Sequence, residues 1–236
     1  MRCTLLALAA LVACCGRMVA QAGPPQNGET LTYSVNWPSS LPLGEARLQA
    51  KRTEAPDGSG ARWDLSFTLD ASVPGFQIAG RYRSLATSEL CSVEFEKDST
   101  HGKRAARELT VFDQQAGSAI RQTLGDGGKS EMPIPPCAKD ALALLYYVRR
   151  EMSLGRLPAP QTVFFGGAYQ IRFEYGGRQK LMIGNEQIEA DRLTGSVKGK
   201  ASDLTFEMFI SQDRARRPVL IRVPLPLAAF SMELVP

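Results

Sequence analysis

The sequence predicts a mainly β fold: a curved antiparallel sheet, or an open or closed barrel-like meander, with one long helix packed against it. Two observations lead to this expectation. About a dozen short segments alternate apolar and polar residues, which is the period of a strand with one buried face. Only residues 138–155 instead repeat apolar residues at three- and four-residue spacing. Because so many strands do not stay open and flat, the sheet must curl or split into two layers.

Length and composition suit a single globular domain. The chain has 236 residues, 44% of them hydrophobic and 22% charged, which is enough for one sizeable core. Its net charge is +4, or +2 once Arg2 and Arg17 of the N-terminal segment are set aside, which is too near neutral to indicate nucleic-acid binding. Arg214, Arg216 and Arg217 form one dense basic cluster. We interpret this cluster as a solvated turn, and an anionic head group or polymer is the alternative.

The first 22 residues have the features of an export signal. Arg2 precedes a short apolar run at residues 5–13, which is too short to cross a membrane, and small residues follow at Ala20 and Ala22. Cleavage after Ala22 would leave residues 23–236 as a single periplasmic domain without a membrane-spanning segment.

Two cleavage patterns compete in this leader. Cleavage after Ala22 leaves an even pair of cysteines, Cys91 and Cys137, which an oxidising compartment is expected to join in a disulfide. The alternative is the lipobox that ends at Cys14, which would make the protein a lipoprotein anchored through that residue.

The clearest strand before the helix lies at residues 62–71. Its predicted inward side consists of Trp63, Leu65, Phe67, Leu69 and Ala71, and polar residues occupy the other side. The opening strand has the same period, with Leu31, Tyr33, Val35 and Trp37 on one side. Further strands are expected at residues 46–50, 78–85, 91–95, 109–112, around 120, and, after the helix, at 162–165, 169–175, 180–183, 187–194, 204–210, 219–223 and 228–234. We expect turns at residues 125–130, 176–177, 184–185 and 198–200, where glycines gather.

Residues 138–155 are the predicted helix. Its apolar stripe consists of Ala141, Leu144, Leu145, Val148 and Met152, whereas Arg149 and Arg150 fall outside the stripe. Asp140 places negative charge in the first turn, and Gly155 can supply a left-handed cap. We therefore expect a helix that buries one face against the sheet.

Several short motifs occur in a fixed order along the chain. They are Gly28-Glu29-x-Leu31-x-Tyr33, the helix that begins with Asp140 and ends in Arg149, the turn from Asp213 to Pro218, and the closing segment 230–235. In these features the sequence resembles the exported bacterial family known as domain of unknown function 3108. One departure is Ala143, where the family usually has a serine-like residue. The resemblance implies an envelope location and a β-rich fold, and it implies no activity.

The residues offer little for catalysis, and we expect no enzyme and no cofactor. His101 is the one histidine and lies in a polar turn. A serine hydrolase triad would have to use this residue as its base, and a zinc site would lack a full set of ligands. A carboxylate-based hydrolase is the least favoured alternative, because nothing in the spacing selects two catalytic residues. The strand carboxylates available for it are Glu94, Glu96, Asp113, Glu174 and Glu207.

Two function classes therefore remain. The first is a periplasmic binding or carrier module for an apolar or amphipathic, lipid-like molecule. Its predicted lining residues are Trp37, Trp63, Leu65, Phe67 and Tyr147, for each of which plain core packing is the alternative. The second is a structural or interaction protein that meets another protein of the cell envelope. A cavity would favour the first, and a filled core with an exposed apolar patch would favour the second.

Overall fold

The computed structural model describes residues 23–236 except 38–40, 57, 59, 74, 126, 201–202 and 226–227. The predicted leader, with Cys14, lies outside these residues. In the described part of the chain, fifteen strands form one sheet. The strands before the helix are β1 (Glu29–Trp37), β2 (Leu41–Glu54), β3 (Ala61–Val73), β4 (Phe76–Thr87), β5 (Ser92–His101), β6 (Arg104–Asp113), β7 (Ser118–Thr123), β8 (Lys129–Pro133) and β9 (Lys139–Asp140). After the helix α1 (Ala141–Ser153) come β10 (Gln161–Phe164), β11 (Ala168–Ile183), β12 (Glu186–Lys198), β13 (Asp203–Ser211), β14 (Pro218–Leu225) and β15 (Ala228–Leu234).

The sheet consists of two meanders joined at the first and last strands. Strands β1 to β8 are consecutive antiparallel neighbours, β10 to β15 are another such series, and β15 pairs with β1. The short strand β9 pairs in parallel with β10. Within the described residues the edge strands β8 and β9 are not neighbours, so the sheet is open. The predicted mainly β fold with one helix is confirmed.

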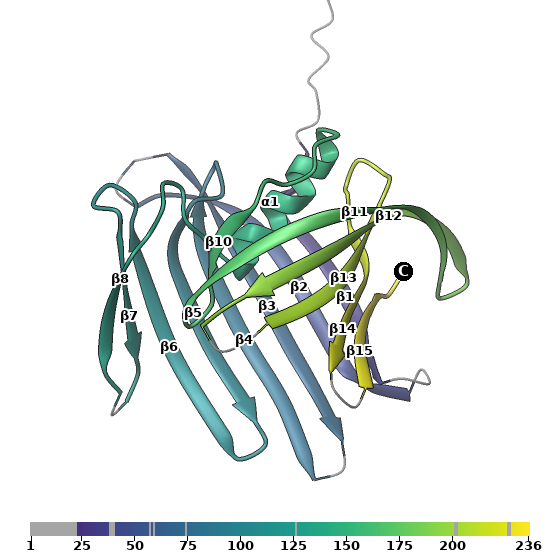
Figure 1. The fold of residues 1–236 in the computed structure, drawn as a ribbon, viewed down its shortest axis with the longest axis horizontal. Coiled ribbons are helices and arrows are strands. Elements are labelled where there is room, and N and C mark those ends of the chain that lie inside the picture. Colours follow the sequence, from purple (N-terminus) through teal and green to yellow (C-terminus); the bar gives the residue numbers. More distant parts are fainter. Residues whose placement is uncertain are drawn as a thin grey trace, which may run out of the picture.

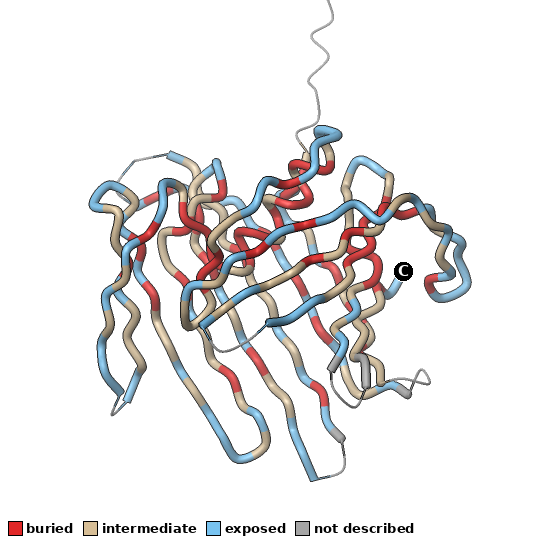
Figure 2. Tube along the Cα trace, viewed as in Figure 1, coloured by how far each residue is buried: buried red, intermediate tan, exposed pale blue. Residues whose placement is uncertain are grey.

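The two meanders enclose α1. Figure 1 shows β2–β5 running behind the helix and β10–β13 crossing in front of it. One group of buried side chains joins Leu142 and Tyr146 of the helix to Leu48 and Leu65 of the first meander. A second group joins other helix residues to the strands β10–β13. Buried segments therefore gather around α1, as Figure 2 shows.

This arrangement corrects the prediction of a helix with one buried face. The predicted stripe residues Leu144, Val148 and Met152 are buried against the second meander, but Leu142 and Tyr146 are equally buried against the first. The side chain of Arg149, which the sequence places outside the stripe, has no exposed surface. A helix between two walls of a sheet has apolar neighbours on both sides, so its buried surface is wider than one stripe.

The start of α1 is fixed by the buried carboxylate of Asp140. This side chain is the N-cap and accepts hydrogen bonds from the backbone N–H groups of Leu142 (2.8 Å) and Ala143 (3.0 Å). The hydroxyls of Ser84 and Ser92 donate to its other oxygen at 2.6 and 2.5 Å. Burial raises the pKa of Asp140, while these four hydrogen bonds act in the opposite direction.

The end of α1 is the predicted left-handed glycine cap. Gly155 has φ +69°, and its N–H donates to the carbonyl of Met152 at 3.1 Å. The N–H of Arg156 donates to the carbonyl of Glu151 at 2.9 Å, which completes a Schellman motif. The helix is nevertheless shorter than predicted, because its first residue is Ala141 and its last is Ser153.

A disulfide joins Cys91 and Cys137, whose Cα atoms are 4.5 Å apart. Cys91 directly precedes β5, and Cys137 lies two residues before β9. The N–H of Ser92 also donates to the carbonyl of Ala138 at 2.9 Å. The cross-link therefore holds the segment that leads into α1 against the first meander.

The turn predicted at residues 176–177 is wrong. Gly176 and Gly177 lie inside the continuous strand β11, where the pairing with β12 shifts between Tyr175 and Arg178. A bulge uses glycine in the same left-handed conformation as a turn, and Gly177 has φ +88°. The turn predicted at residues 184–185 lies between β11 and β12 as predicted. Of the turn predicted at 125–130, residues 129–130 belong to β8, and of the turn predicted at 198–200, Lys198 belongs to β12.

Candidate ligand-binding groove

An apolar groove lies between α1 and the strands β10–β14. It has a volume of about 900 Å³ and is open to solvent. From the helix it is lined by Ala141, Leu144, Leu145 and Val148. From the strands and the β10–β11 turn it is lined mainly by Val163, Phe165, Tyr169, Ile171, Phe173, Val197, Phe206, Met208 and Ile221. We call this feature the α1–β14 groove.

Local periodicity explains why these side chains converge. On β11, Ile171 and Phe173 are buried on the groove side, whereas Arg172 between them is exposed. On α1, Leu144 and Val148 are four residues apart and therefore lie on one helix face. The groove forms because the apolar side of these strands is wider than the part of it that α1 covers.

A glycine shapes the wall of the α1–β14 groove. Gly195 of β12 is the cross-strand neighbour of both Phe173 of β11 and Phe206 of β13. The two rings meet edge to face, with centroids 6.1 Å apart. A Cβ atom at residue 195 would stand 2.4 Å from the ring of Phe206. Glycine at this position therefore allows the aromatic pair to form.

Few polar side chains reach the α1–β14 groove. Among the described lining residues they are Tyr169, Asp203 and Thr205, and none is basic. Asp203 and Thr205 are exposed, as is Leu204 between them, so this segment lies at the mouth of the groove. A surface of this kind can hold an apolar group by removing it from water.

None of the five predicted lining residues is part of this groove. Leu65 is fully buried, and Trp63, Phe67 and Tyr147 are half-buried against the main core. Trp37 packs edge-on against Phe230, with the ring centroids 4.8 Å apart. Their contact with a ligand remains untested.

The sequence contained a signal for the groove that the prediction did not use. Leu144, Leu145 and Val148 belong to the predicted stripe of the helix, but their partners come from strands that follow the helix. Tyr169, Ile171 and Phe173 alternate with polar residues just as strictly as the strand that contains Trp63 does, and Phe206, Met208 and Ile210 show the same period.

A fully buried charge lies outside the groove, near the end of α1. The guanidinium of Arg149 pairs with both carboxylate oxygens of Glu29 and also donates to the carbonyls of Ala215 and Arg216. Burial opposes the charged form, but the hydrogen bonds and charge of Glu29 outweigh it and raise the pKa of Arg149. The pair ties together α1, β1 and the β13–β14 turn.

Two tyrosines surround this ion pair. Tyr33 and Tyr146 are buried, and within the described residues their hydroxyl groups have no partner with hydrogen-bond geometry. Burial raises the pKa of both hydroxyls. The guanidinium carbon of Arg149 lies 4.8 Å from the ring centroid of Tyr146, a cation–π contact. The cluster is closed to solvent, so we interpret it as a structural tie.

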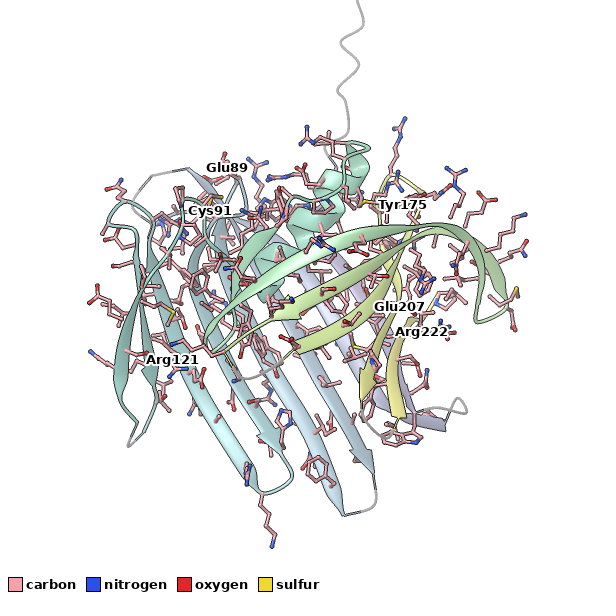
Figure 3. All side chains as sticks on the ribbon, in the orientation of Figure 1. Glu89, Cys91, Arg121, Tyr175, Glu207 and Arg222 are labelled. Atoms are coloured by element: carbon pink, nitrogen blue, oxygen red, sulfur yellow. A yellow bond between two sulfur atoms is a disulfide. The ribbon has the colours of Figure 1, made fainter. Side chains whose placement is uncertain are left out.

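The side chains considered for catalysis are dispersed. His101 is exposed at the end of β5. Glu96 pairs with Arg83, and Glu207 pairs with Arg192 and Arg222, the last of which lies beside it in Figure 3. Among the described residues, no three histidine, cysteine, aspartate or glutamate side chains are close enough to hold a metal ion.

The turn at residues 213–218, which was predicted to be solvated, is partly buried and held by ion pairs. Arg216 is half-buried and pairs with Asp191 at 2.8 Å, and Arg217 pairs with Asp213 at 2.7 Å. Only Arg214 of the basic cluster is exposed. The turn therefore presents carbonyl groups to Arg149 rather than a cluster of three free cations to solvent.

Comparison with known proteins places the chain in a family. Residues 32–235 match the family described as "Protein of unknown function (DUF3108)". The chain belongs to this DUF3108 family. No curated protein matches the sequence. In the described part of this DUF3108 protein, no helix is both long and apolar enough to cross a membrane.

Two solved structures are similar in fold to this DUF3108 protein. The β-barrel-like protein of domain of unknown function DUF1849 from Brucella abortus has a TM-score of 0.58 at 8% identity, covering 87% of this chain and 94% of that chain. A protein named "putative lipoprotein" from Parabacteroides distasonis has a TM-score of 0.35 at 7% identity, covering 90% of this chain and 95% of that chain. At these identities the first likeness shows the fold alone, and the second is too remote to carry an argument.

Three of the four motifs that carry the DUF3108 resemblance meet at the Arg149 cluster. Glu29 and Tyr33 come from the opening motif, Arg149 from the helix, and Ala215 and Arg216 from the turn. These motifs therefore describe how the helix is tied into the sheet. They do not describe the α1–β14 groove.

Proposed function

We propose that the protein is an exported binding or carrier protein that holds an apolar or amphipathic, lipid-like molecule in the α1–β14 groove. The observation that carries the proposal is an open groove of about 900 Å³ with almost entirely apolar walls. Ligand sites commonly have this volume and this composition. The proposal assigns no reaction to the protein.

An envelope location is part of the proposal. Its support is the leader-like N-terminal sequence and the disulfide between Cys91 and Cys137, because disulfides persist mainly in oxidising compartments. We expect cell fractionation to recover the protein from the periplasm. Its intact mass should equal that of a chain that begins at Gly23. A mass that includes a lipid on Cys14 would instead show an anchored lipoprotein.

The binding test uses N-phenyl-1-naphthylamine, a neutral probe whose fluorescence rises in apolar surroundings. We expect saturable binding to the purified mature protein and displacement by dodecanol. Ile221→Glu should abolish binding, because it places a charge on the half-buried groove wall. Ile120→Glu is the matched control, because Ile120 is 46% exposed on β7 and is not among the groove residues.

The outcome must separate lost binding from lost folding. Both variants are compared with the parent by urea denaturation, and Val197→Glu provides a second groove variant at a half-buried position. Loss of probe binding in folded groove variants, with retention in Ile120→Glu, supports the proposal. No saturable binding by the folded parent protein would overturn it.

An envelope interaction protein is the second candidate. It is favoured by Val111 and Ile120, a cross-strand pair whose members are each 46% exposed on β6 and β7. Paired apolar side chains on an exposed face can contact another protein. Site-specific crosslinking from position 120 in intact cells would test this candidate, and it would fail if Val111→Glu left every crosslinked product unchanged.

A further inference from the structure

We propose that the ligand of the α1–β14 groove carries an anionic head group, which binds beside Lys97 and Arg121 under the β10–β11 turn. This inference rests on the proposed function and adds the chemical class of the ligand. The ligand is therefore an anionic amphiphile rather than a neutral lipid or a cationic one.

The first step is the character of the concave face of the first meander. Directly opposite residues in a sheet point to the same side. One cross-strand row consists of Leu48, Phe67, Tyr82, Lys97, Glu108 and Thr123. The neighbouring row consists of Ala50, Leu65, Ser84, Phe95, Thr110 and Arg121. Leu65 and Phe95 belong to the core around α1, so both rows face inward. Along each row the side chains change from apolar to charged between β4 and β7.

The second step is that these charges are enclosed. The side chain of Lys97 is 18% exposed and that of Glu108 is 15% exposed, although both are charged residues on strands. The β10–β11 turn covers them, since a Cβ atom on Gly166 would lie 3.0 Å from Glu108 Oε2 and 3.5 Å from Lys97 Nζ. Arg121, labelled in Figure 3, donates a hydrogen bond to the carbonyl of Gly166 in the same turn.

The third step is an unused capacity for hydrogen bonds. Lys97 Nζ and Glu108 Oε2 are 3.8 Å apart, a distance that allows an ion pair but is too long for a hydrogen bond. Within the described residues the ammonium group of Lys97 donates no hydrogen bond, and Glu108 Oε2 accepts none. Two cations and one carboxylate leave a local charge of about +1, which suits one anionic group.

The fourth step connects this cluster to the α1–β14 groove. The ring of Phe165 lines the groove, and Lys97 Nζ lies 5.1 Å from the centroid of the same ring. The ring of Tyr82, beside Lys97 on the next strand, is 5.5 Å from that of Phe165. Phe165 thus contacts both the groove and Lys97, and we place the head group of a chain in the groove beside this ring.

The test compares ligands with one twelve-carbon chain and different head groups. Dodecanoate, dodecyl phosphate, dodecanol and dodecylammonium compete for N-phenyl-1-naphthylamine, each below its critical micelle concentration. We expect the anionic competitors to bind about tenfold more tightly than dodecanol, and the preference to weaken as salt rises. The two anions distinguish a carboxylate head group from a phosphate.

Variants assign the preference to the two cations. In Lys97→Met and Arg121→Gln, dodecanoate affinity should fall about tenfold while dodecanol affinity stays within about twofold. Lys180→Met is the matched control, because Lys180 is exposed on β11. If Lys97→Met fails to fold, Arg121→Gln alone makes the same comparison.

The outcomes separate the two proposals. If neither dodecanoate nor dodecanol displaces the probe, the groove proposal itself fails. If both displace it equally in the parent and in the variants, the groove stands and the anionic head group is overturned. Preferential binding of dodecylammonium would also overturn it and would assign the head group to Glu108.

Discussion

Arg149 and Glu29 form a bidentate ion pair with both N–O distances at 2.6 Å, although 120 residues separate them along the chain. The side chain of Arg149 has no exposed surface, and that of Glu29 is 7% exposed. Removing one member of such a pair leaves the other charge buried without compensation. The pair therefore makes the position of α1 dependent on the first strand of the sheet.

The first prediction concerns this pair. Glu29→Gln should lower the free energy of unfolding by about 3 to 5 kcal/mol, because it leaves the guanidinium buried against a neutral amide. Glu189→Gln is the matched control, since Glu189 pairs with Lys180 at 3.9 Å on the exposed face and should change stability by less than about 0.5 kcal/mol. Equal effects in urea denaturation would contradict the structural role assigned to Glu29.

The second prediction concerns the disulfide. Cys91 and Cys137 are 46 residues apart in sequence, so the bond restricts a long loop of the unfolded chain. Replacing both by serine should lower the free energy of unfolding by about 2 to 4 kcal/mol. Thiol labelling of the denatured, unreduced mature protein should detect no free thiol. Two labelled thiols would show that the bond does not form.

The third prediction is a pH dependence that originates at Lys139. This ammonium donates to the carbonyl of Cys137 at 2.9 Å, and burial, with a smaller contribution from the charge of Arg150, lowers its pKa from 10.5 to about 8. Between about pH 8 and 10.5 the unfolded chain keeps a proton that the folded state has released. The unfolded state then binds more protons, so stability attributable to Lys139 rises with pH across this window.

The measurement compares the parent protein with Lys139→Met by urea denaturation from pH 7 to above 10. We expect the stability of the parent relative to Lys139→Met to increase through the window. A difference that is flat or falls with pH would contradict the lowered pKa of Lys139.

The fourth prediction concerns the glycine in the groove wall. Gly195→Ala should cost about 1 to 3 kcal/mol of stability, because the new methyl group would meet the ring of Phe206 at 2.4 Å. Gly128→Ala is the control, since no atom lies within 4 Å of a Cβ there. Adding Phe206→Ala to Gly195→Ala should recover part of the loss in a double-mutant cycle. Purely additive effects would show that the two positions do not interact.

Much of the local structure could be predicted from the sequence. The alternation of Trp63, Leu65 and Phe67 gave the correct inward side of β3, because period two is a direct consequence of strand geometry. Gly155 marked the end of α1 because it adopts a left-handed backbone at little cost. The same reasoning misplaced Gly176 and Gly177, because a bulge and a turn make the same demand on the backbone.

The candidate groove was predicted only in outline. The apolar side of each strand and the stripe residues Leu144 and Val148 follow from periodicity, and they led to the hypothesis of a ligand beneath the helix. The predicted partners came from the strands before the helix, such as Trp63 and Phe67. The walls of the observed groove come from β10–β14, because an alternating pattern shows which side of a strand is buried but not which strands share a wall.

The sequence by itself determined the fold class, the strand periods, the glycine cap that ends the helix and the pair of cysteines available for a disulfide. Each of these depends on residues close together in the chain, or on chemistry that needs no partner position. Only the tertiary structure decided that β15 pairs with β1, that the sheet surrounds α1, and that Arg149 is buried against Glu29. Those outcomes depend on how two meanders pack around one helix. Because this packing joins segments that are distant in the sequence, no local pattern encodes its energy.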